Sequence, residues 1–258
     1  MRKVVFIGAG NVSTSLAYAF SNAGWSIAQV YSRTINSASA LANLYSSNAI
    51  NIISEIEYSA DLYIIAVPDS SIFEIVDLIP SANGVVVHTS GSTPLSVLSK
   101  LKSRGIGVFY PFQTFSRSRI VELSSVPIFV EAGSDDILNF LTSIGNELSH
   151  NVSYLNSEKR LLLHISGVFA CNFTNHILAL TYRLANENGI DFKVLQPLVE
   201  ETVIKAFTAN PKDVQTGPAI RNDISTMNKH SELLGNFDEQ LQRIYNELSL
   251  SIQKLGKL

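Results

Sequence analysis

Short apolar runs alternate with helical patterns over the first 155 residues of the chain. The runs are four to six residues long and rich in valine and isoleucine, which is typical of strands buried on both faces. Between several of them, apolar residues recur at spacings of three and four, which predicts helices. This alternation predicts βαβ units and an α/β fold with a mostly parallel sheet. The predicted strands are residues 4–7, 27–31, 62–67, 85–89, 107–110, 127–131 and 152–155, and the predicted helices after the first are 38–45, 71–79, 94–102 and 135–147.

The pattern changes after about residue 155, where the strand-like runs stop. Long helical patterns then cover about 157–189, 192–209 and 237–255. We therefore expect two domains, an α/β domain over residues 1–155 and an all-helical domain over residues 156–258.

A glycine-rich turn joins the first predicted strand to the first predicted helix. Gly8 and Gly10 stand in this turn, which is the context in which such glycines indicate a Rossmann-like, dinucleotide-binding domain. Gly8 permits a tight turn, and Gly10 lets a pyrophosphate approach the backbone. The N–H groups at the start of the helix, at Asn11 and Val12, would attract the charge of that pyrophosphate. Ser13 replaces the third glycine of the pattern, and the alternative interpretation is a purely structural turn.

The end of the second predicted strand indicates which cofactor binds. NAD-binding domains place an acidic residue there to bind the ribose 2′-hydroxyl, but this chain has Ser32, Arg33 and Thr34 and no acid. Arg33 can grip a 2′-phosphate through paired N–H groups, and the two hydroxyls add donors. The sequence therefore favours NADP over NAD, unless Arg33 is simply a solvated loop residue.

The next two strand ends lie where the nicotinamide half of the cofactor is expected. Ligands of open α/β sheets bind beyond the carboxyl ends of the strands. Val67, Pro68 and Asp69 follow one of these strands, and His88 and Ser90 mark the end of the other. We expect both segments to border the nicotinamide, although the aspartate has the alternative role of capping the following helix.

Several polar residues share the first long helix of the C-terminal domain. Asn172 and Asn175 need hydrogen-bond partners if they are buried. Gly167 costs about 1 kcal/mol relative to alanine inside a helix, which a close approach of another backbone or a ligand would explain. These features fit either a functional site or packing against a partner subunit. At 100° per residue, one stripe of this helix holds His164, Val168, Cys171 and Asn175.

Two loops add further candidates. Arg221 lies in the segment 217–223, where it could hold a substrate carboxylate or phosphate, or pair with Asp223 and fix the loop. The segment 109–116 carries four aromatic residues and could line a cleft between the domains or form the apolar seam that joins them.

Composition excludes several classes of protein. The chain has 258 residues, 46% of them apolar and 16% charged, which predicts a globular protein with a large core. Its net charge of −3 and the lack of a basic run argue against nucleic-acid binding. Cys171 is the only cysteine, so no disulfide forms within the chain, and its apolar neighbours suggest a core residue. The histidines lack the spacing of metal ligands, so we expect no metal.

The location expected from the sequence is the cytoplasm. The first residues predict a strand rather than a signal peptide, because the apolar run is short and ends in glycines. No segment approaches the roughly 20 apolar residues that would span a bilayer, so no membrane partner is expected.

The motifs together resemble a bacterial family that joins a Rossmann-like NADP-binding domain to an uncharacterised all-helical C-terminal domain. The residues that carry the resemblance are 8–13, 110–115, 164–176 and 217–223. This family is similar to pyrroline-5-carboxylate reductase, ketopantoate reductase and the deazaflavin-dependent NADP reductases. The resemblance implies an NADP-linked oxidoreductase, a C-terminal domain like that of 6-phosphogluconate dehydrogenase, and a homodimer formed through that domain. It implies no particular substrate.

One departure from the related enzymes stands out. The β-hydroxyacid dehydrogenases carry a catalytic lysine four residues before an asparagine. If Asn172 matches that asparagine, Val168 occupies the lysine position, which argues against lysine-based chemistry.

The leading hypothesis is hydride transfer between NADPH and a small C=O or C=N substrate in the cleft between the domains. His88 or His164 would donate the proton or polarise the acceptor. Asn172 and Asn175 would orient the substrate, and Arg221 would hold an acidic group. The alternative is a regulatory or scaffolding protein that binds NADPH without catalysis.

Overall fold

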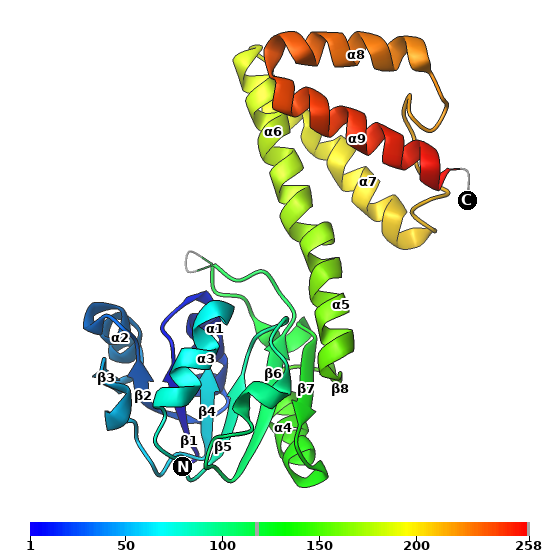
Figure 1. The fold of residues 1–258 in the computed structure, drawn as a ribbon. Coiled ribbons are helices and arrows are strands. Elements are labelled where there is room, and N and C mark those ends of the chain that lie inside the picture. Colours follow the sequence, from blue (N-terminus) through cyan, green and yellow to red (C-terminus); the bar gives the residue numbers. More distant parts are fainter. Residues whose placement is uncertain (117–118, 257–258) are drawn as a thin grey trace. The chain divides into compact units, whose positions relative to one another are not determined.

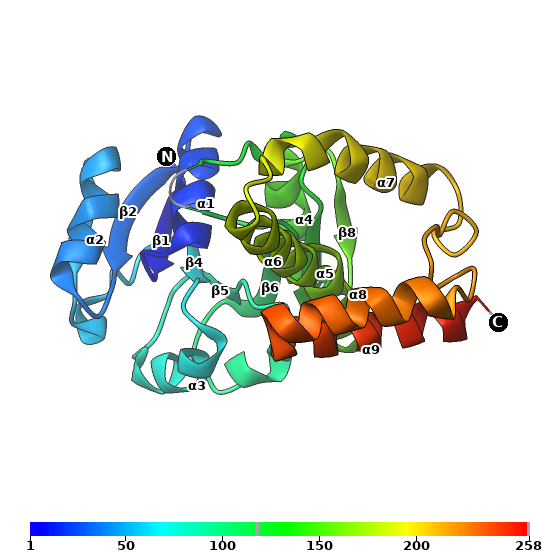
Figure 2. The ribbon, with the colours of Figure 1, turned by 90° about the horizontal axis from the view of Figure 1, so that it is seen from above.

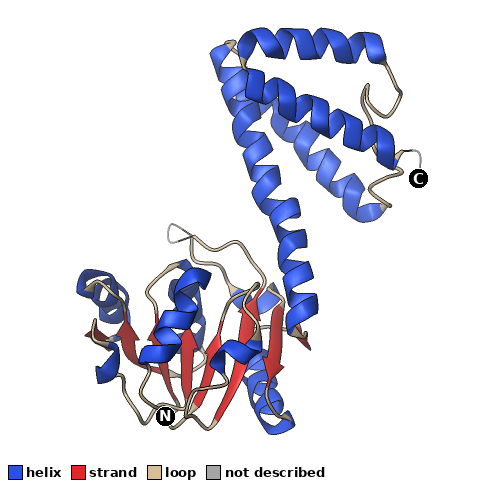
Figure 3. Cartoon of the chain, viewed as in Figure 1, coloured by secondary structure: helices blue, strands red, loops and turns tan. Residues whose placement is uncertain are grey.

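The computed structural model describes residues 1–116 and 119–256. They form two compact units, Met1–Cys171 and Asn172–Leu258. The first begins with an α/β sheet and includes the start of a long helix, and the second is helical (Figure 3). The boundary expected at residues 155–156 lies just before that helix and stays a prediction.

An eight-stranded sheet forms the core of the first unit, in the order β3-β2-β1-β4-β5-β6-β7-β8 (Figure 1). All neighbouring strands are parallel except β6 and β7, which are antiparallel. The mostly parallel sheet of the first unit and the helices of the second confirm the predicted fold class. The strands are β1 (Lys3–Ile7), β2 (Ser26–Tyr31), β3 (Asn48–Ile50), β4 (Leu62–Ile65), β5 (Val85–His88), β6 (Gly105–Pro111), β7 (Ile128–Ala132) and β8 (Val152–Tyr154).

Helices cover both faces of the sheet, which is why the central strands are apolar at nearly every position. On one face, Val4 and Phe6 of β1 belong to a core cluster with α1, α2 and α4. On the other face, Val5 and Ile7 pack with α3. All four side chains are fully buried. The helices of this unit are α1 (Asn11–Asn22), α2 (Ile35–Ala42), α3 (Asp69–Leu78) and α4 (Asp135–Leu148), together with the 3₁₀ turns η1 (Asn43–Tyr45), η2 (Ile53–Glu55), η3 (Leu95–Leu98) and η4 (Leu123–Ser125).

A helical path continues from the first unit into the second. It consists of α5 (Ser157–Gly167), the π-helical segment η5 (Val168–Phe173) and α6 (Thr174–Glu187). In the second unit, α8 and α9 pack side by side (Figure 1; Figure 2). The remaining elements are η6 (Phe192–Leu195), α7 (Gln196–Thr208), α8 (Ile224–Phe237) and α9 (Glu239–Leu255).

The sequence pattern missed some elements and overstated one. The helix predicted over 94–102 is only the short turn η3, whereas the strand β3 and the helix α8 were not predicted. The helix α8 begins at an aspartate cap, Asp223, whose carboxylate accepts a hydrogen bond from the amide N–H of Thr226. That cap was a usable signal, but five consecutive polar residues, 228–232, interrupt the apolar spacing of the segment that follows it.

The helix from Ser157 to Glu187 corrects the expectation that no segment is apolar enough to span a bilayer. It has 31 residues and a window of mean hydropathy 1.3, so it is long and apolar enough to cross a membrane by length and composition. No residue of that window is buried within the described chain. Core helices that are mostly buried meet the same criterion, but this window is unburied within one chain; only the start of the helix carries a buried ion pair, Arg160–Glu131, against the sheet.

Candidate functional site

The glycine turn after β1 forms an open cradle at the start of α1. Gly8 has a φ of +119°, and a Cβ there would lie 2.2 Å from the carbonyl oxygen of Ala66. The position therefore requires glycine for both conformation and space. A Cβ at Gly10 would meet nothing within 4 Å, so the backbone faces open space at this point. No side chain caps α1, which begins at Asn11, so the N-terminal end of the helix is available to an anion. Ser13, in the place of the third glycine, is fully buried and lets α1 pack on the sheet.

A cavity of about 240 Å³ extends from this turn. It lies between the glycine turn, the end of β2 and helix α3. Arg33 and Ser32 line it, as predicted for the two residues after β2. Ser37 also lines it and was missed by the sequence analysis, because only the first turn of α2 brings its hydroxyl to the cavity. Glu74 contributes the acidic part of the wall from α3. The predicted cofactor-binding residues found along this cavity are Gly8, Gly10, Ser32, Arg33, Val67 and Pro68.

The other five predicted residues of the cofactor site lie outside that lining: Asn11, Val12, Thr34, Asp69 and Ser90. The Thr34 hydroxyl donates a hydrogen bond to Ser37 Oγ at 2.8 Å. The Asn11 side-chain amide donates to the carbonyl of Phe115 at 3.0 Å, and so ties the start of α1 to a distant loop. Val12 is half-buried and packs against the core of the sheet.

The loop after β5 is held in one conformation by its own hydroxyls. The Ser90 hydroxyl, buried in this loop, accepts hydrogen bonds from the backbone N–H groups of Ser92 and Thr93, at 3.1 and 2.9 Å. Asp69 bonds this loop through the hydroxyl of Ser92 and does not cap α3 with its side chain. The two predicted residues, Ser90 and Asp69, therefore meet at the same loop.

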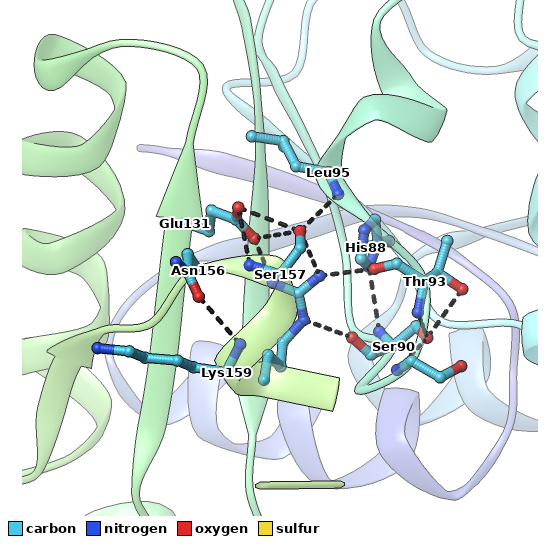
Figure 4. Close-up of polar contacts among 10 residues, drawn as sticks. His88, Ser90, Thr93, Leu95, Glu131, Asn156, Ser157 and Lys159 are labelled. Carbon is cyan, nitrogen blue, oxygen red and sulfur yellow. Dashed lines mark hydrogen bonds and ion pairs between the residues drawn. The ribbon is translucent and has the colours of Figure 1, made fainter. Parts of the chain in front are cut away.

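A buried arginine of α5, Arg160, links this loop to the start of the helix, and Figure 4 labels three of its partners, Ser90, Thr93 and Glu131. Arg160 is 1% exposed, and its guanidinium donates to the carbonyl oxygens of Ser90 and Thr93 and to the carboxylate of Glu131. The same carboxylate accepts hydrogen bonds from the backbone N–H and the hydroxyl of Ser157. Sequence reasoning missed this arrangement, because one arginine and one glutamate 29 residues apart form no local pattern.

His88 lies at the end of β5 and is fully buried. Its Nδ1 accepts a hydrogen bond from the backbone N–H of Ser90 at 3.2 Å, and its Nε2 has no hydrogen-bond partner in the described part of the chain. Burial lowers the pKa of His88 to about 4, and the positive charge of Arg160 acts in the same direction. The imidazole is therefore neutral at physiological pH.

A second histidine meets a tyrosine at the end of β6. The hydroxyl of Tyr110 lies 3.1 Å from Nδ1 of His164, a half-buried residue of α5. Burial raises the pKa of Tyr110 to about 12, and the nearby carboxylate of Asp69 adds to the effect. A Cβ at Gly91 would lie 2.6 Å from this Nδ1, so the loop backbone passes directly over the pair. His164 is a predicted site residue, whereas the partner tyrosine was seen only as part of an aromatic segment.

The helix that carries the predicted asparagines changes geometry after Gly167. A Cβ there would lie 2.9 Å from the ring of Phe112, so a close approach does explain the glycine. The π-helical segment that follows holds about one residue more per turn than an α-helix. The stripe expected from a regular helix is therefore wrong beyond Val168. Because the π-turn adds about one residue, the stripe that contains His164 and Val168 continues through Asn172 and His176, and not through Cys171 and Asn175.

The predicted residues of the second unit are exposed. Asn172, Asn175 and Arg221 all lie on its surface, and Arg221 makes no ion pair with another described residue. Asp223 instead bonds Thr226 through its carboxylate. Cys171, at the end of the first unit, is exposed as well, so the expectation of a core residue is wrong.

The comparisons with known proteins agree with this architecture. Residues 1–109 match a Rossmann-like domain, and residues 126–252 match a domain of unknown function, DUF2520. A search of curated proteins gives no match. A solved Bacteroides fragilis structure, described as a "putative NADP oxidoreductase", is 40% identical, covers 98% of both chains and has a TM-score of 0.92.

More distant solved structures share the fold. A Thermotoga maritima protein is 19% identical over 99% of this chain and all of its own, with a TM-score of 0.81. An imine reductase from Myxococcus stipitatus, in complex with NADP⁺, is 13% identical over 99% of this chain and 93% of its own, with a TM-score of 0.65. By its close similarity to the Bacteroides fragilis protein and its two matched domains, the chain belongs to a family that joins a Rossmann-like domain to the DUF2520 domain.

Proposed function

We propose that this protein is an NADP-dependent oxidoreductase that transfers a hydride between NADPH and a small C=O or C=N substrate. The observation that carries the proposal is the cavity beside the glycine turn. Its lining includes the open backbone of Gly10, at an uncapped helix N-terminus, and the side chain of Arg33. The name of the Bacteroides fragilis relative supports the same activity.

The residues of the cavity fit NADP better than NAD. The start of α1 would hold the pyrophosphate, and Arg33, Ser32 and Ser37 would bind the 2′-phosphate. The acidic residue of the cavity, Glu74, comes from α3 and not from the end of β2, where NAD-binding domains place the acid that binds the ribose. The cofactor, when bound, supplies the hydride.

The proton is assigned to His164 rather than to His88. His88 is fully buried and its pKa is near 4, so it carries no proton to give at neutral pH. His164 is half-buried, and of its two ring nitrogens only Nδ1 makes a hydrogen bond within the described residues. We propose that Nε2 of His164 donates the proton to the substrate oxygen or nitrogen.

The substrate is proposed to bind in the cleft between the two domains. We propose from the sequence that Asn172 and Asn175 orient the substrate. Arg221 would hold an acidic group of the substrate. The exposure of all three side chains in the single chain leaves them available for such contacts.

We also propose that the protein is a homodimer formed through the helical domain. This unit exposes large apolar side chains: Phe207 is 88% exposed and Leu198 is 66% exposed. A second copy would bury such faces. The net charge of −3 and the lack of a basic run disfavour an anionic membrane surface as the alternative cover.

Titration with NADPH and with NADH tests the cofactor assignment. We expect NADPH to bind about 10- to 100-fold more tightly, because the 2′-phosphate gains charge-assisted hydrogen bonds. Arg33→Ala should remove most of that preference, whereas Arg243→Ala, on an exposed position of α9, should leave it intact. Equal affinity of the wild-type protein for both cofactors would refute the assignment.

Turnover tests the reaction itself. The protein and NADPH are mixed with a panel of ketones, keto acids and imines, and loss of NADPH absorbance is followed. Consumption that depends on one of these substrates supports the proposal. Tight NADPH binding with no turnover across the panel would favour the regulatory or scaffolding alternative.

A further inference from the structure

We propose that Tyr110 is a positioning residue that holds His164 with its proton on Nε2, the nitrogen that faces away from the tyrosine. The catalytic consequence rests on the proposed function, whereas the state of the imidazole can be measured without it. Neither the sequence motifs nor the comparisons assign a role to this tyrosine.

The contact joins two elements of the same compact unit. Tyr110 stands near the carboxyl end of β6, two residues beyond Val108, which pairs with His88. Its hydroxyl lies 3.1 Å from Nδ1 of His164 on α5. The tyrosine ring is held from the side by Phe112, with 6.0 Å between ring centroids. The pair therefore lies at the edge of the sheet where ligands of such folds bind.

The loop after β5 leaves room for this contact only because residue 91 is glycine. A Cβ at Gly91 would lie 2.6 Å from His164 Nδ1 and 2.8 Å from the Tyr110 hydroxyl. The loop cannot easily retreat, because Arg160 binds the carbonyls on either side of this glycine, at Ser90 and Thr93. The histidine and tyrosine are thus packed against a fixed backbone.

The direction of the hydrogen bond follows from the chemistry of the two groups. Burial keeps the tyrosine hydroxyl protonated at physiological pH, with its pKa raised to about 12. Two charged groups, Asp69 and Arg160, influence Tyr110 electrostatically, and Arg160 is paired with Glu131. A neutral imidazole has one donor and one acceptor nitrogen. Within the described residues Nδ1 of His164 is the only hydrogen-bond partner of the Tyr110 hydroxyl, so in the neutral pair the hydroxyl donates to Nδ1 and the imidazole proton stays on Nε2.

The same contact survives when the imidazole is protonated. In the imidazolium form Nδ1–H donates to the tyrosine oxygen, whose own hydrogen can rotate away. In the reduction, the substrate carbon gains the hydride from NADPH and its double bond breaks. The electrons of that bond move to the oxygen or nitrogen, which takes the proton from Nε2. The proton left on His164 is the one on Nδ1, bonded to the tyrosine oxygen, and uptake of a proton from water at Nε2 regenerates the donor.

Nitrogen-15 NMR of the full chain labelled at histidine tests the inference. The His164 signals are assigned by their loss in His164→Gln. In the wild-type protein at a pH where this imidazole is neutral, we expect the proton on Nε2. In Tyr110→Phe we expect a mixture of the two tautomers, and in the control Tyr154→Phe, on an exposed tyrosine of β8, no change.

A purely structural contact gives a different result. In that case Tyr110→Phe alters stability but leaves the tautomer of His164 as it was. A wild-type signal with the proton on Nδ1, or an unchanged tautomer in folded Tyr110→Phe, would overturn the inference. If Tyr110→Phe does not fold, Gly91→Ala serves instead, because the added methyl group must displace the histidine or the tyrosine.

Kinetics separates this inference from the proposed function. If a substrate is found, Tyr110→Phe should lower kcat about tenfold or more and shift the alkaline limb of its pH profile, where a proton donor loses its proton, with the affinity for NADPH unchanged. An unchanged kcat and pH profile would contradict the positioning role. If no substrate is turned over, the proposed function fails, and the tautomer in the NMR spectrum still decides the present inference.

Discussion

At the scale of single residues, the buried guanidinium of Arg160 ties three segments together. It binds the loop after β5 through two carbonyl oxygens and pairs with Glu131 of β7, whose carboxylate also holds the first residue of α5. Its side chain is 1% exposed. Removing one partner of a buried ion pair leaves the other charge buried and unpaired, which lowers the free energy of unfolding by several kcal/mol.

Arg160→Met should therefore lower the free energy of unfolding by about 3–5 kcal/mol. Urea denaturation measures the change, with Arg243→Met on the surface of α9 as the control. The double variant Arg160→Met with Glu131→Gln should lose less than the sum of the single changes, because the carboxylate is then no longer an unpaired charge. A loss below about 1 kcal/mol in Arg160→Met would show that the pair does not hold the loop.

His88 should make stability depend on pH. Its pKa is about 4 in the folded chain, against an ordinary value of 6.5. Between these two values the unfolded state binds more protons at this residue, so stability falls as the pH drops from about 6.5 to about 4. The pKa difference corresponds to about 3 kcal/mol at most.

Urea denaturation at pH 7.5 and pH 5 measures this dependence. His88→Gln should lose less stability than the wild-type protein between these two pH values. The exposed His150 offers the matched control, since His150→Gln should keep the wild-type dependence. The same loss on acidification in His88→Gln and wild type would mean that other groups account for it.

At the scale of secondary-structure elements, the change from α- to π-geometry after Gly167 is the least regular feature of the chain. This glycine faces the ring of Phe112, which itself packs against Phe129. Alanine favours a helix over glycine by about 1 kcal/mol, but an overpacked contact costs about 1–3 kcal/mol. We therefore expect the contact with Phe112 to outweigh helix propensity when Gly167 is replaced by alanine.

Gly167→Ala should therefore lower the free energy of unfolding by about 1 kcal/mol in the wild-type background. In a Phe112→Ala background the same substitution should raise it by about 1 kcal/mol, because the clash is gone and helix propensity remains. Thermal or urea denaturation of the four proteins measures both effects. Stabilisation by Gly167→Ala in both backgrounds would rule out the proposed conflict with the aromatic ring.

The sequence predicted those elements whose signals are local. The apolar runs of β1, β4 and β5 come from strands covered on both faces, and Gly8 marks the turn that follows the first of them. The candidate cofactor residues Ser32 and Arg33 were found for the same reason, since their place after β2 is a matter of chain order. The antiparallel pairing of β7 with β6 has no local signal in the sequence, because the two strands would be equally apolar in a parallel pair.

The contacts that complete the candidate site depend on residues far apart in the chain. Tyr110 and His164 are 54 residues apart, and Arg160 reaches Ser90 across 70. Nothing in the neighbourhood of either pair in the sequence specifies the other member. The π-segment was missed for a related reason, since the glycine before it is packed against an aromatic side chain from another element.

At the scale of the whole molecule, the helical domain cannot bury its own apolar residues. Of its described apolar side chains, only those of Ala185, Ala219, Leu234 and Leu241 are buried. An exposed apolar surface of this extent marks a site that binds another protein, a ligand or a membrane. The long helix Ser157–Glu187 adds a window of 18 residues that is unburied within one chain.

Light scattering coupled to gel filtration should therefore give about twice the 28.2 kDa mass of one chain at micromolar concentration. Phe207→Glu, at the most exposed apolar position of α7, should shift the protein toward the monomer, because a charge would be buried in the contact. Phe73→Glu, at an exposed position of α3 in the other unit, is the matched control and should leave the mass unchanged. Sedimentation with lipid vesicles tests the alternative that a membrane covers these helices. A wild-type protein that is monomeric in buffer and pellets with vesicles would show that lipid, and not a second copy, covers these helices.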